Sequence, residues 1–303
     1  MGQTTKTILV IVSVFLVLVA AAALISTWII ADDIVHDPVE DRDPITKTPS
    51  DYGLPFESVT VTTPSGITLA GWYIPSQNGA AIILQHGFEE NRQDLLEAAA
   101  MLQKHDYGVL LSSVRGHDQN GEEMITFGCR EMEDIEAWYQ HLLTRDDVDP
   151  ERVGILGQSM GGSLVIQYAK DNEQIKAVVA HSPLTSLNDT VDVGLRKYTP
   201  IPDPLVPILK PLVIMWGEQI TGCDLEDVNA NEWIGEISPR PVYLICGGKD
   251  KLVLEENCRA LYAQAREPVT FWLEDTCAHH DCDVLYPEEF EERLIEFIGV
   301  LME

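Results

Sequence analysis

The sequence predicts an α/β fold in which a mostly parallel sheet is flanked by helices on both faces and preceded by one N-terminal transmembrane helix. Three observations support this prediction. From residue 57 onward, short apolar runs typical of buried strands alternate with stretches whose apolar residues have helical spacing. One long insertion, residues 184–239, interrupts the alternation, and a long apolar segment lies near the N-terminus. Alternating strands and helices indicate parallel strands joined by helical crossovers.

The N-terminal apolar segment, residues 8–30, is long enough to cross a bilayer. At about 1.5 Å per residue, a helix of this length spans a hydrocarbon core of roughly 30 Å. Lys6 precedes it and Asp32-Asp33 follow it, so we expect the short N-terminus in the cytoplasm and the body of the protein outside. A cleaved signal peptide is the alternative, since residues 20–23 are small, but the apolar run continues beyond them. We expect an uncleaved signal-anchor.

The chain is therefore divided into three parts. Residues 1–31 form the anchor, and residues 32–56, rich in Asp and Pro, are expected to be an extended linker. Residues 57–302 form the catalytic domain, with residues 184–239 as a cap insertion. This insertion is rich in proline, aromatic and apolar residues, which indicates that it packs over the domain rather than forming a free loop.

The domain begins with two strands joined by a turn at Pro64-Ser65-Gly66. Strands are expected at residues 58–62, 69–74, 80–85, 108–112, 152–156, 175–180, 241–246 and 269–273. Helices are expected at residues 93–104, 132–143, 162–170, 254–264 and 288–301. The last helix is amphipathic, with Phe290 and Leu294 on its apolar face and glutamates on the other.

The composition is strongly acidic, with 20 Lys and Arg against 49 Asp and Glu and a formal net charge of −29. This excludes nucleic acid as a partner, because its phosphates would be repelled. It also disfavours strongly anionic substrates and an anionic membrane face. We interpret the charge as a solvated acidic surface. The sequence contains no glycine-rich nucleotide-binding loop, so no cofactor is expected.

Six cysteines, an even number, are compatible with disulfides in an exported protein. Cys246 lies in an apolar strand-like run and is expected to be a buried thiol. Cys277 and Cys282 are the closest pair and could bridge locally. With the histidines and aspartates near them they superficially resemble a metal cluster, but the spacing matches no usual zinc pattern, so no metal is expected.

The pentapeptide Gly157-Gln158-Ser159-Met160-Gly161 lies between the strand at 152–156 and the following helix. A Gly-x-Ser-x-Gly sequence at a strand-to-helix junction is the nucleophile elbow of an α/β hydrolase. The chain reverses so tightly there that side chains two residues either side of the serine would collide. Ser159 is therefore the predicted nucleophile.

A serine hydroxyl needs a base to remove its proton, and the base needs an acid that fixes its tautomer. In this fold the order along the chain is Ser, acid, His. Asp250 follows the strand at 241–246 and is the predicted acid, with Asp275 and Glu274 as alternatives. Two adjacent histidines, 279 and 280, follow the last strand. Only one of them can face the serine, and the spacing alone leaves both open.

Acyl transfer also needs hydrogen-bond donors aimed at the developing oxyanion. The residue after the nucleophile, Met160, would supply one backbone N–H. Phe88 is the candidate for the second, because His86-Gly87-Phe88 follows the strand at 80–85 and Gly87 permits a close approach. His86 precedes the serine in the chain, so we interpret it as a structural residue that holds this loop.

These residues resemble the α/β-hydrolase superfamily over about residues 57–302, and within it bacterial serine hydrolases of the BEM46-like and serine aminopeptidase (S33-like) groups. The shared pieces are His86-Gly87-Phe88, Arg115-Gly116-His117, Gly157-Gln158-Ser159-Met160-Gly161-Gly162, Ser238-Pro239-Arg240-Pro241 and Gly248-Lys249-Asp250. In such relatives a Pro-Glu-Glu-aromatic pattern opens the last helix eight residues beyond the catalytic histidine. Pro287-Glu288-Glu289-Phe290 therefore implies His279 as the base, and the small Ala278 before it fits the same pattern.

The sequence thus predicts a membrane-anchored serine hydrolase that cleaves an ester or related acyl bond. The apolar cap favours an uncharged, medium-sized acyl substrate. A peptidase or aminopeptidase with the same mechanism is the nearest alternative. A non-catalytic module tethered to the membrane is a third, but it predicts that at least one triad position is replaced, and none is.

Overall fold

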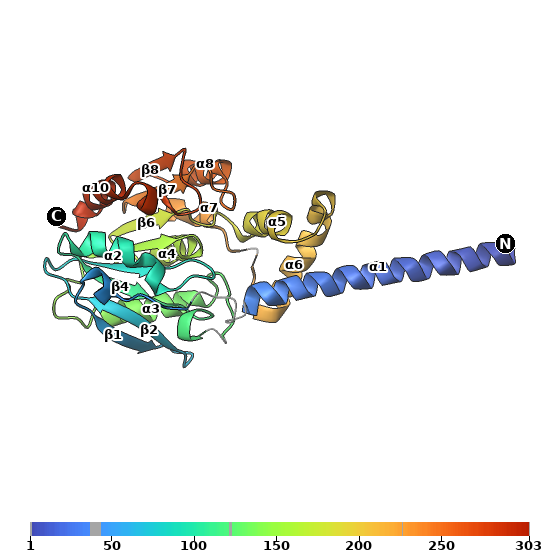
Figure 1. Cartoon of the computed structure of the whole chain (residues 1–303), viewed down its shortest axis with the longest axis horizontal. Helices are drawn as coiled ribbons and strands as arrows, with labels where there is room; N and C mark the ends of the chain where they lie inside the picture. Colours follow the sequence, from blue (N-terminus) through green and yellow to red (C-terminus); the bar gives the residue numbers. More distant parts are fainter. Residues whose placement is uncertain (1, 37–43, 121–122, 226, 303) are drawn as a thin grey trace.

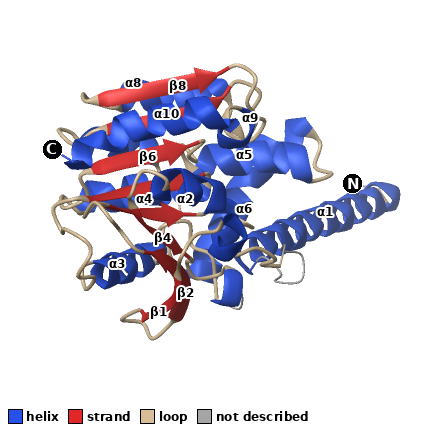
Figure 2. Cartoon of the chain, turned by 60° about the vertical axis from the view of Figure 1, so that its left-hand side comes forward, coloured by secondary structure: helices blue, strands red, loops and turns tan. Residues whose placement is uncertain are grey.

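The computed structural model describes residues 2–36, 44–120, 123–225 and 227–302. Their centre is an eight-stranded sheet of order β1-β2-β4-β3-β5-β6-β7-β8 (Figure 2). The strands are β1 Glu57–Thr62, β2 Thr68–Ile74, β3 Ala81–Gln85, β4 Gly108–Ser112, β5 Val153–Gln158, β6 Ala177–His181, β7 Val242–Gly247 and β8 Val269–Glu274. β2 pairs antiparallel with β1 and β4, and the strands from β4 to β8 in this order run parallel.

Helices cover both faces of the sheet. One face carries α2 (Leu96–Gln103) and α10 (Pro287–Ile298), and the other carries α3 (Glu131–Leu142), α4 (Met160–Asp171) and α8 (Glu255–Gln264). Successive residues of a strand face opposite sides, so Ile83 belongs to one apolar cluster while Ile82 and Leu84 belong to the other. The predicted fold class is confirmed, and each strand lies within two residues of its predicted ends.

Two local differences have clear causes. The helix predicted at 93–104 begins as a 3-10 turn, Arg92–Leu95, because the Asn91 side chain accepts a hydrogen bond from Gln93 N–H and fixes the chain entry. A short helix before α10, α9 (Cys282–Leu285), was not predicted. It has only four residues, too few for a periodic pattern.

The cap lies between β6 and β7 and is helical. It contains α5 (Leu187–Tyr198), a 3-10 turn (Asp203–Leu205), α6 (Val206–Thr221), α7 (Ala230–Trp233) and a second 3-10 turn (Ile234–Glu236). α6 continues through Pro211, although proline lacks the donor for the intrahelical bond. This explains why the prolines of the insertion concealed a sixteen-residue helix from sequence analysis.

The N-terminal segment is one helix, α1 (Gln3–His36), with a mean hydropathy of 3.3 in its most apolar window. By length and composition it could span a membrane or serve as a signal sequence. Its C-terminal turns pack against α6 (Figure 1), where Thr27, Ala31 and Val35 are buried at a spacing of four residues. Ile125 N–H donates to the Val35 carbonyl at 2.8 Å, so the end of α1 is attached to the domain.

The stretch after α1 differs from the extended linker predicted for residues 32–56. α1 itself continues to His36. Residues 37–43 lie outside the described part, and beyond them the chain forms a 3-10 turn, Pro49–Tyr52, on the domain surface. Thr46 N–H donates to Gln93 Oε1 at 2.8 Å. The Asp and Pro content disfavours a long helix, but it does not prevent this stretch from packing on the surface of the domain.

The six cysteines form three disulfides, Cys129–Cys223, Cys246–Cys258 and Cys277–Cys282. The expectation of a buried free thiol at Cys246 is wrong. Its side chain is buried on the face of β7 that α8 covers, where it meets Cys258. The sequence alone did not indicate which helix residue would face this strand. Cys129–Cys223 joins the segment before α3 to the end of cap helix α6.

Candidate active site

Ser159 lies in the turn between β5 and α4 with a positive φ, at φ 52° and ψ −119°. The two flanking glycines are needed for this geometry. A Cβ on Gly157 would lie 2.2 Å from the Gly161 carbonyl oxygen, and one on Gly161 would lie 2.3 Å from the Gln85 carbonyl oxygen. A non-glycine residue is strained in this region, so the surrounding structure must hold it in place.

His279 lies between Ser159 and Asp250. Its Nε2 is 2.7 Å from Ser159 Oγ, and its Nδ1 is 2.6 Å from Asp250 Oδ2. With the proton on Nδ1, the imidazole donates to the carboxylate and accepts from the hydroxyl. The three residues follow β5, β7 and β8, whose carboxyl ends share one edge of the sheet. The predicted acid, base and nucleophile are thus adjacent and lie in one hydrogen-bonded chain.

The orientation of Asp250 is fixed by the backbone that follows it. Its Oδ1 accepts hydrogen bonds from Leu252 N–H at 2.8 Å and Val253 N–H at 2.9 Å. The other oxygen, Oδ2, is left to face His279. The alternative acid Glu274 instead accepts hydrogen bonds from Thr276 in its own loop.

The two predicted oxyanion donors belong to segments on either side of Ser159. Met160 is the first residue of α4, where backbone N–H groups have no intrahelical acceptor. The loop that carries Phe88 passes close to the serine, since a Cβ on Gly87 would lie 3.1 Å from Ser159 Cβ. His86 is buried, and its Nδ1 lies 2.8 Å from the Gly87 carbonyl oxygen, which fits the structural role expected for it.

Comparison with known proteins shows what this chain is similar to. Residues 76–217 match the family model for serine aminopeptidase, S33. The uncharacterised protein YfhR of Escherichia coli (strain K12) is 26% identical over 251 residues, which cover 80% of each chain. The α/β-hydrolase domain-containing protein WAV2 of Arabidopsis thaliana is 26% identical over 248 residues, 77% of this chain and 75% of that protein.

Among solved structures, the esterase Pf2001 of Pyrococcus furiosus superposes with a TM-score of 0.73. It is 26% identical, and the match covers 86% of this chain and 97% of the esterase. The chain has the α/β-hydrolase fold of these proteins. These relationships support hydrolase activity.

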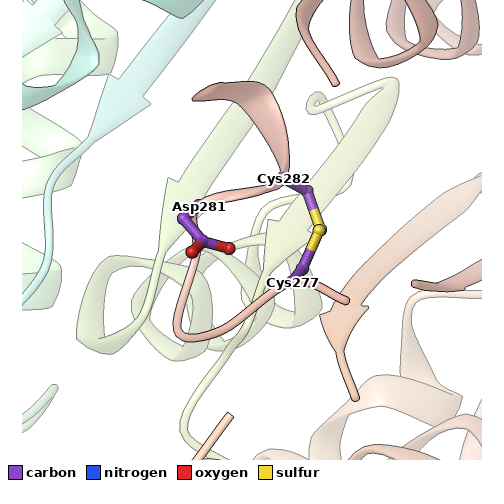
Figure 3. Close-up of side chains that lie close together, drawn as sticks. All are labelled: Cys277, Asp281 and Cys282. Atoms are coloured by element: carbon purple, nitrogen blue, oxygen red, sulfur yellow. A yellow bond between two sulfur atoms is a disulfide. The ribbon is translucent and has the colours of Figure 1, made fainter. Parts of the chain in front are cut away.

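The base loop of this hydrolase, residues 277–282, is closed by the disulfide between its two ends (Figure 3). Inside the loop, Ala278 N–H donates to Asp281 Oδ1 at 2.7 Å. Cys277, Asp281 and Cys282 have ligand atoms within 4.8 Å of one another, which resembles a metal site. Their two sulfurs are bonded to each other, so neither is a thiolate that could bind a metal. The bridge instead restrains the loop that carries His279.

Whereas His279 contacts the nucleophile, His280 pairs with Glu90. Its Nε2 lies 2.7 Å from Glu90 Oε1, and Glu90 Oε2 accepts the Gly87 N–H at 2.6 Å. Burial alone lowers the pKa of the His280 imidazole, but the hydrogen bond and charge of Glu90 outweigh it and raise that pKa. Burial alone raises the pKa of the Glu90 carboxyl, but His280 outweighs it and lowers that pKa. Both shifts favour an ion pair.

Glu90 was not found by sequence analysis. It lies three residues after Gly87 in an acidic surface-like stretch, and its partner is far away in the chain. Arg115, from the shared piece Arg115-Gly116-His117, has a structural role. It is buried and forms an ion pair with Asp134 at 2.6 Å and with Glu133 at 3.0 Å.

A surface cavity of about 560 Å³ lies elsewhere, at the opposite end of α4. It is lined mainly by polar residues of α3 and by residues 171–174 after α4. Since Ser159 is at the start of the twelve-residue α4, the two sites are roughly 18 Å apart along its axis. The cavity is therefore separate from the candidate active site.

Proposed function

We propose that this hydrolase cleaves carboxylic esters through Ser159, His279 and Asp250 by way of an acyl-enzyme. The single observation that supports this proposal most strongly is the continuous Ser159–His279–Asp250 chain of hydrogen bonds at 2.7 and 2.6 Å. These are the contacts that serine acyl transfer requires.

In the first step His279 Nε2 accepts the proton of Ser159 while Oγ bonds to the ester carbonyl carbon. The carbonyl oxygen becomes an oxyanion, for which the N–H groups of Met160 and Phe88 are the proposed donors. The Asp250 carboxylate stabilises the imidazolium. The C–O bond to the alcohol then breaks, and His279 donates its proton to the leaving oxygen, so that the acyl group remains on Ser159.

Water completes the cycle. His279 removes a proton from a water molecule, whose oxygen attacks the acyl-enzyme carbonyl. The bond to Ser159 Oγ breaks, and Oγ recovers the proton from His279. The products are one carboxylic acid and one alcohol, and no cofactor takes part.

We also propose that α1 is an uncleaved membrane anchor and that the hydrolase domain lies on the extracytoplasmic side. Lys6 before the apolar segment and Asp32-Asp33 after it support this orientation. The three disulfides support it independently, because disulfides persist in oxidising compartments.

Ester cleavage is preferred over peptide cleavage because the esterase of Pyrococcus furiosus matches 86% of this chain. The aminopeptidase family model makes the peptidase the second candidate. The full-length protein in detergent should be assayed with p-nitrophenyl esters of increasing chain length and with aminoacyl-nitroanilides. We expect turnover of the esters that is abolished in Ser159→Ala. Nitroanilide turnover alone would support the peptidase, and ester turnover that persists in Ser159→Ala would contradict the mechanism.

A further inference from the structure

The turn between the two long cap helices has an unusually apolar surface. This cap tip, residues 198–211, exposes Tyr198, Leu205 and Ile208, with 66%, 44% and 65% of their surface accessible. Its exposed prolines are at positions 200, 202, 204, 207 and 211. A contiguous apolar patch on a protein surface marks a contact with another molecule or with a membrane.

The cap tip lies next to the membrane helix. α6 packs against α1, and both views show the α5–α6 turn and α1 projecting from the same side of the domain (Figures 1 and 2). Thr27, which is buried, lies inside the apolar segment 8–30, about 5 Å along the helix axis from its end. The contact between cap and anchor therefore reaches the depth at which α1 would already be in the bilayer.

The region around the cap tip is also less acidic than the whole protein. Residues 196–211, which include the last turn of α5, contain Arg196, Lys197 and Lys210 against Asp203, while the chain carries −29. Asp192, one turn before Arg196, forms ion pairs with Arg196 at 2.7 Å and with Lys210 at 3.5 Å. Lys197 Nζ lies 4.6 Å from the centre of the Tyr198 ring. Basic and aromatic side chains around an apolar patch are typical of a membrane interface, where they meet lipid headgroups.

We propose that the cap tip inserts into the bilayer leaflet next to α1, so that the enzyme takes an acyl ester that resides in the membrane. The substrate class is thus a lipid ester with at least one long acyl chain. This inference rests on the proposed function and on α1 as a membrane anchor.

The cap packs against the same apolar cluster that reaches the nucleophile turn. Val206 and Val213 of α6, Ala31 of α1 and Met160 beside the nucleophile belong to one apolar cluster. Ser159 itself is only 5% exposed. An acyl chain that leaves the bilayer beside α6 would remain in apolar surroundings near the cap, whereas a route through water would expose it.

The surface can be tested without an assay of activity. The full-length protein, one copy per phosphatidylcholine nanodisc, would carry the photocrosslinker p-benzoylphenylalanine in place of Ile208. The control carries it in place of Tyr262, which is 38% exposed on α8. We expect lipid adducts at position 208 and few at position 262. Equal labelling at both positions, no lipid adduct, or at higher loading a crosslink only to a second copy of the chain would overturn the proposal.

The substrate class needs a kinetic comparison. The double variant Leu205→Ser with Ile208→Ser should hydrolyse p-nitrophenyl acetate at the wild-type rate, which shows that it is folded. Its hydrolysis of a fluorogenic diacylglycerol ester in phosphatidylcholine vesicles should fall at least tenfold. Equal rates on the vesicle ester would overturn the inference and leave the proposed function intact. If the wild type hydrolyses neither ester, the proposed function fails, and the crosslinking result still decides the membrane surface.

Discussion

Glu90 and His280 form an ion pair of 2.7 Å that joins the loop after β3 to the base loop. The second carboxylate oxygen of Glu90 holds Gly87 N–H at 2.6 Å, beside the proposed donor Phe88. One side chain therefore contacts both the segment proposed to bind the oxyanion and the residue next to the proposed base. We interpret Glu90 and His280 as positioning residues, since neither touches the nucleophile in the described structure.

Replacing Glu90 with glutamine should lower kcat for a soluble ester by about tenfold, with a smaller effect on KM, because the proposed oxyanion donors lose their alignment. Glu291→Gln is a matched control. It removes a His–Glu contact of the same 2.7 Å length, from Glu291 to His105, on the outer surface. Steady-state kinetics of both variants measure kcat and KM. An equal loss of kcat in the two variants would contradict a positioning role for Glu90.

The same pair should make stability depend on pH. The pKa of His280 is raised, so its contribution to the free energy of unfolding is complete at pH values below its ordinary pKa of 6.5. This contribution is lost as the pH rises through the raised pKa. The pKa of Glu90 is lowered, so its contribution to the free energy of unfolding is present at pH values above its ordinary pKa of 4.5. This contribution is lost as the pH falls through the lowered pKa.

Between pH 4.5 and pH 6.5, Glu90→Gln should lower the free energy of unfolding by roughly 1–3 kcal/mol. The difference between variant and wild type should shrink towards pH 9. Asp283 and Asp94 also interact with the pair, and burial raises the pKa of Asp283 to about 6. These two carboxyl groups therefore also contribute to the change in stability at acidic pH. Urea unfolding of wild type and variant at pH 5.5 and pH 9 measures the difference. A difference of the same size at both values would count against the ion pair.

Removing the bridge of the base loop should affect activity more than stability. Cys277→Ser with Cys282→Ser opens a loop of six residues, which costs about 2 kcal/mol in the chain-entropy model. Because His279 lies inside this loop, we expect kcat to fall by about tenfold or more. The corresponding change at Cys129 and Cys223 opens a far longer loop and should cost about 4–5 kcal/mol.

Thermal unfolding and the rate on a soluble ester, measured well below Tm, separate the two bridges. The Cys129 and Cys223 variant should show the larger decrease in Tm. The Cys277 and Cys282 variant should show the larger decrease in the rate of ester hydrolysis. The reverse ranking of rates would show that the base loop holds its shape without the bridge.

The two glycines of the elbow should not tolerate a methyl group. Gly157→Ala would place a Cβ 2.2 Å from the Gly161 carbonyl oxygen, and we expect a loss of about 3 kcal/mol or more together with loss of activity. Gly194→Ala in α5 is the control, because nothing lies within 4 Å of its Cβ position. It should stabilise the helix by roughly 0.5–1 kcal/mol. Equal melting temperatures for the two variants would contradict this account of the elbow.

Sequence reasoning was most effective where a local pattern determines local geometry. The apolar runs determined the strands, and the glycines around Ser159 reflect a turn whose collisions can be worked out from covalent structure. Asp250 and His279 could be nominated because parallel strands deliver their following loops to one edge. The choice between the adjacent histidines came from resemblance, since spacing alone left both open.

Features that depend on distant contacts could not be predicted in this way. The pairing of Glu90 with His280 and of Cys246 with Cys258 depends on which surfaces meet after folding. The helix through Pro211 is stabilised by packing against α1 and the domain, which outweighs its poor local propensity. The docking of α1 on the cap likewise has no periodic signature, because the apolar segment has apolar residues on all sides.

The most direct test of the central claim is to identify the residue that carries the nucleophile. Full-length protein in detergent would be treated with a fluorophosphonate, digested and examined by mass spectrometry. We expect one adduct, on the elbow peptide at Ser159, and its loss in His279→Ala and Ser159→Ala. A folded wild-type protein that forms no adduct, or forms it on another residue, would contradict the proposed triad.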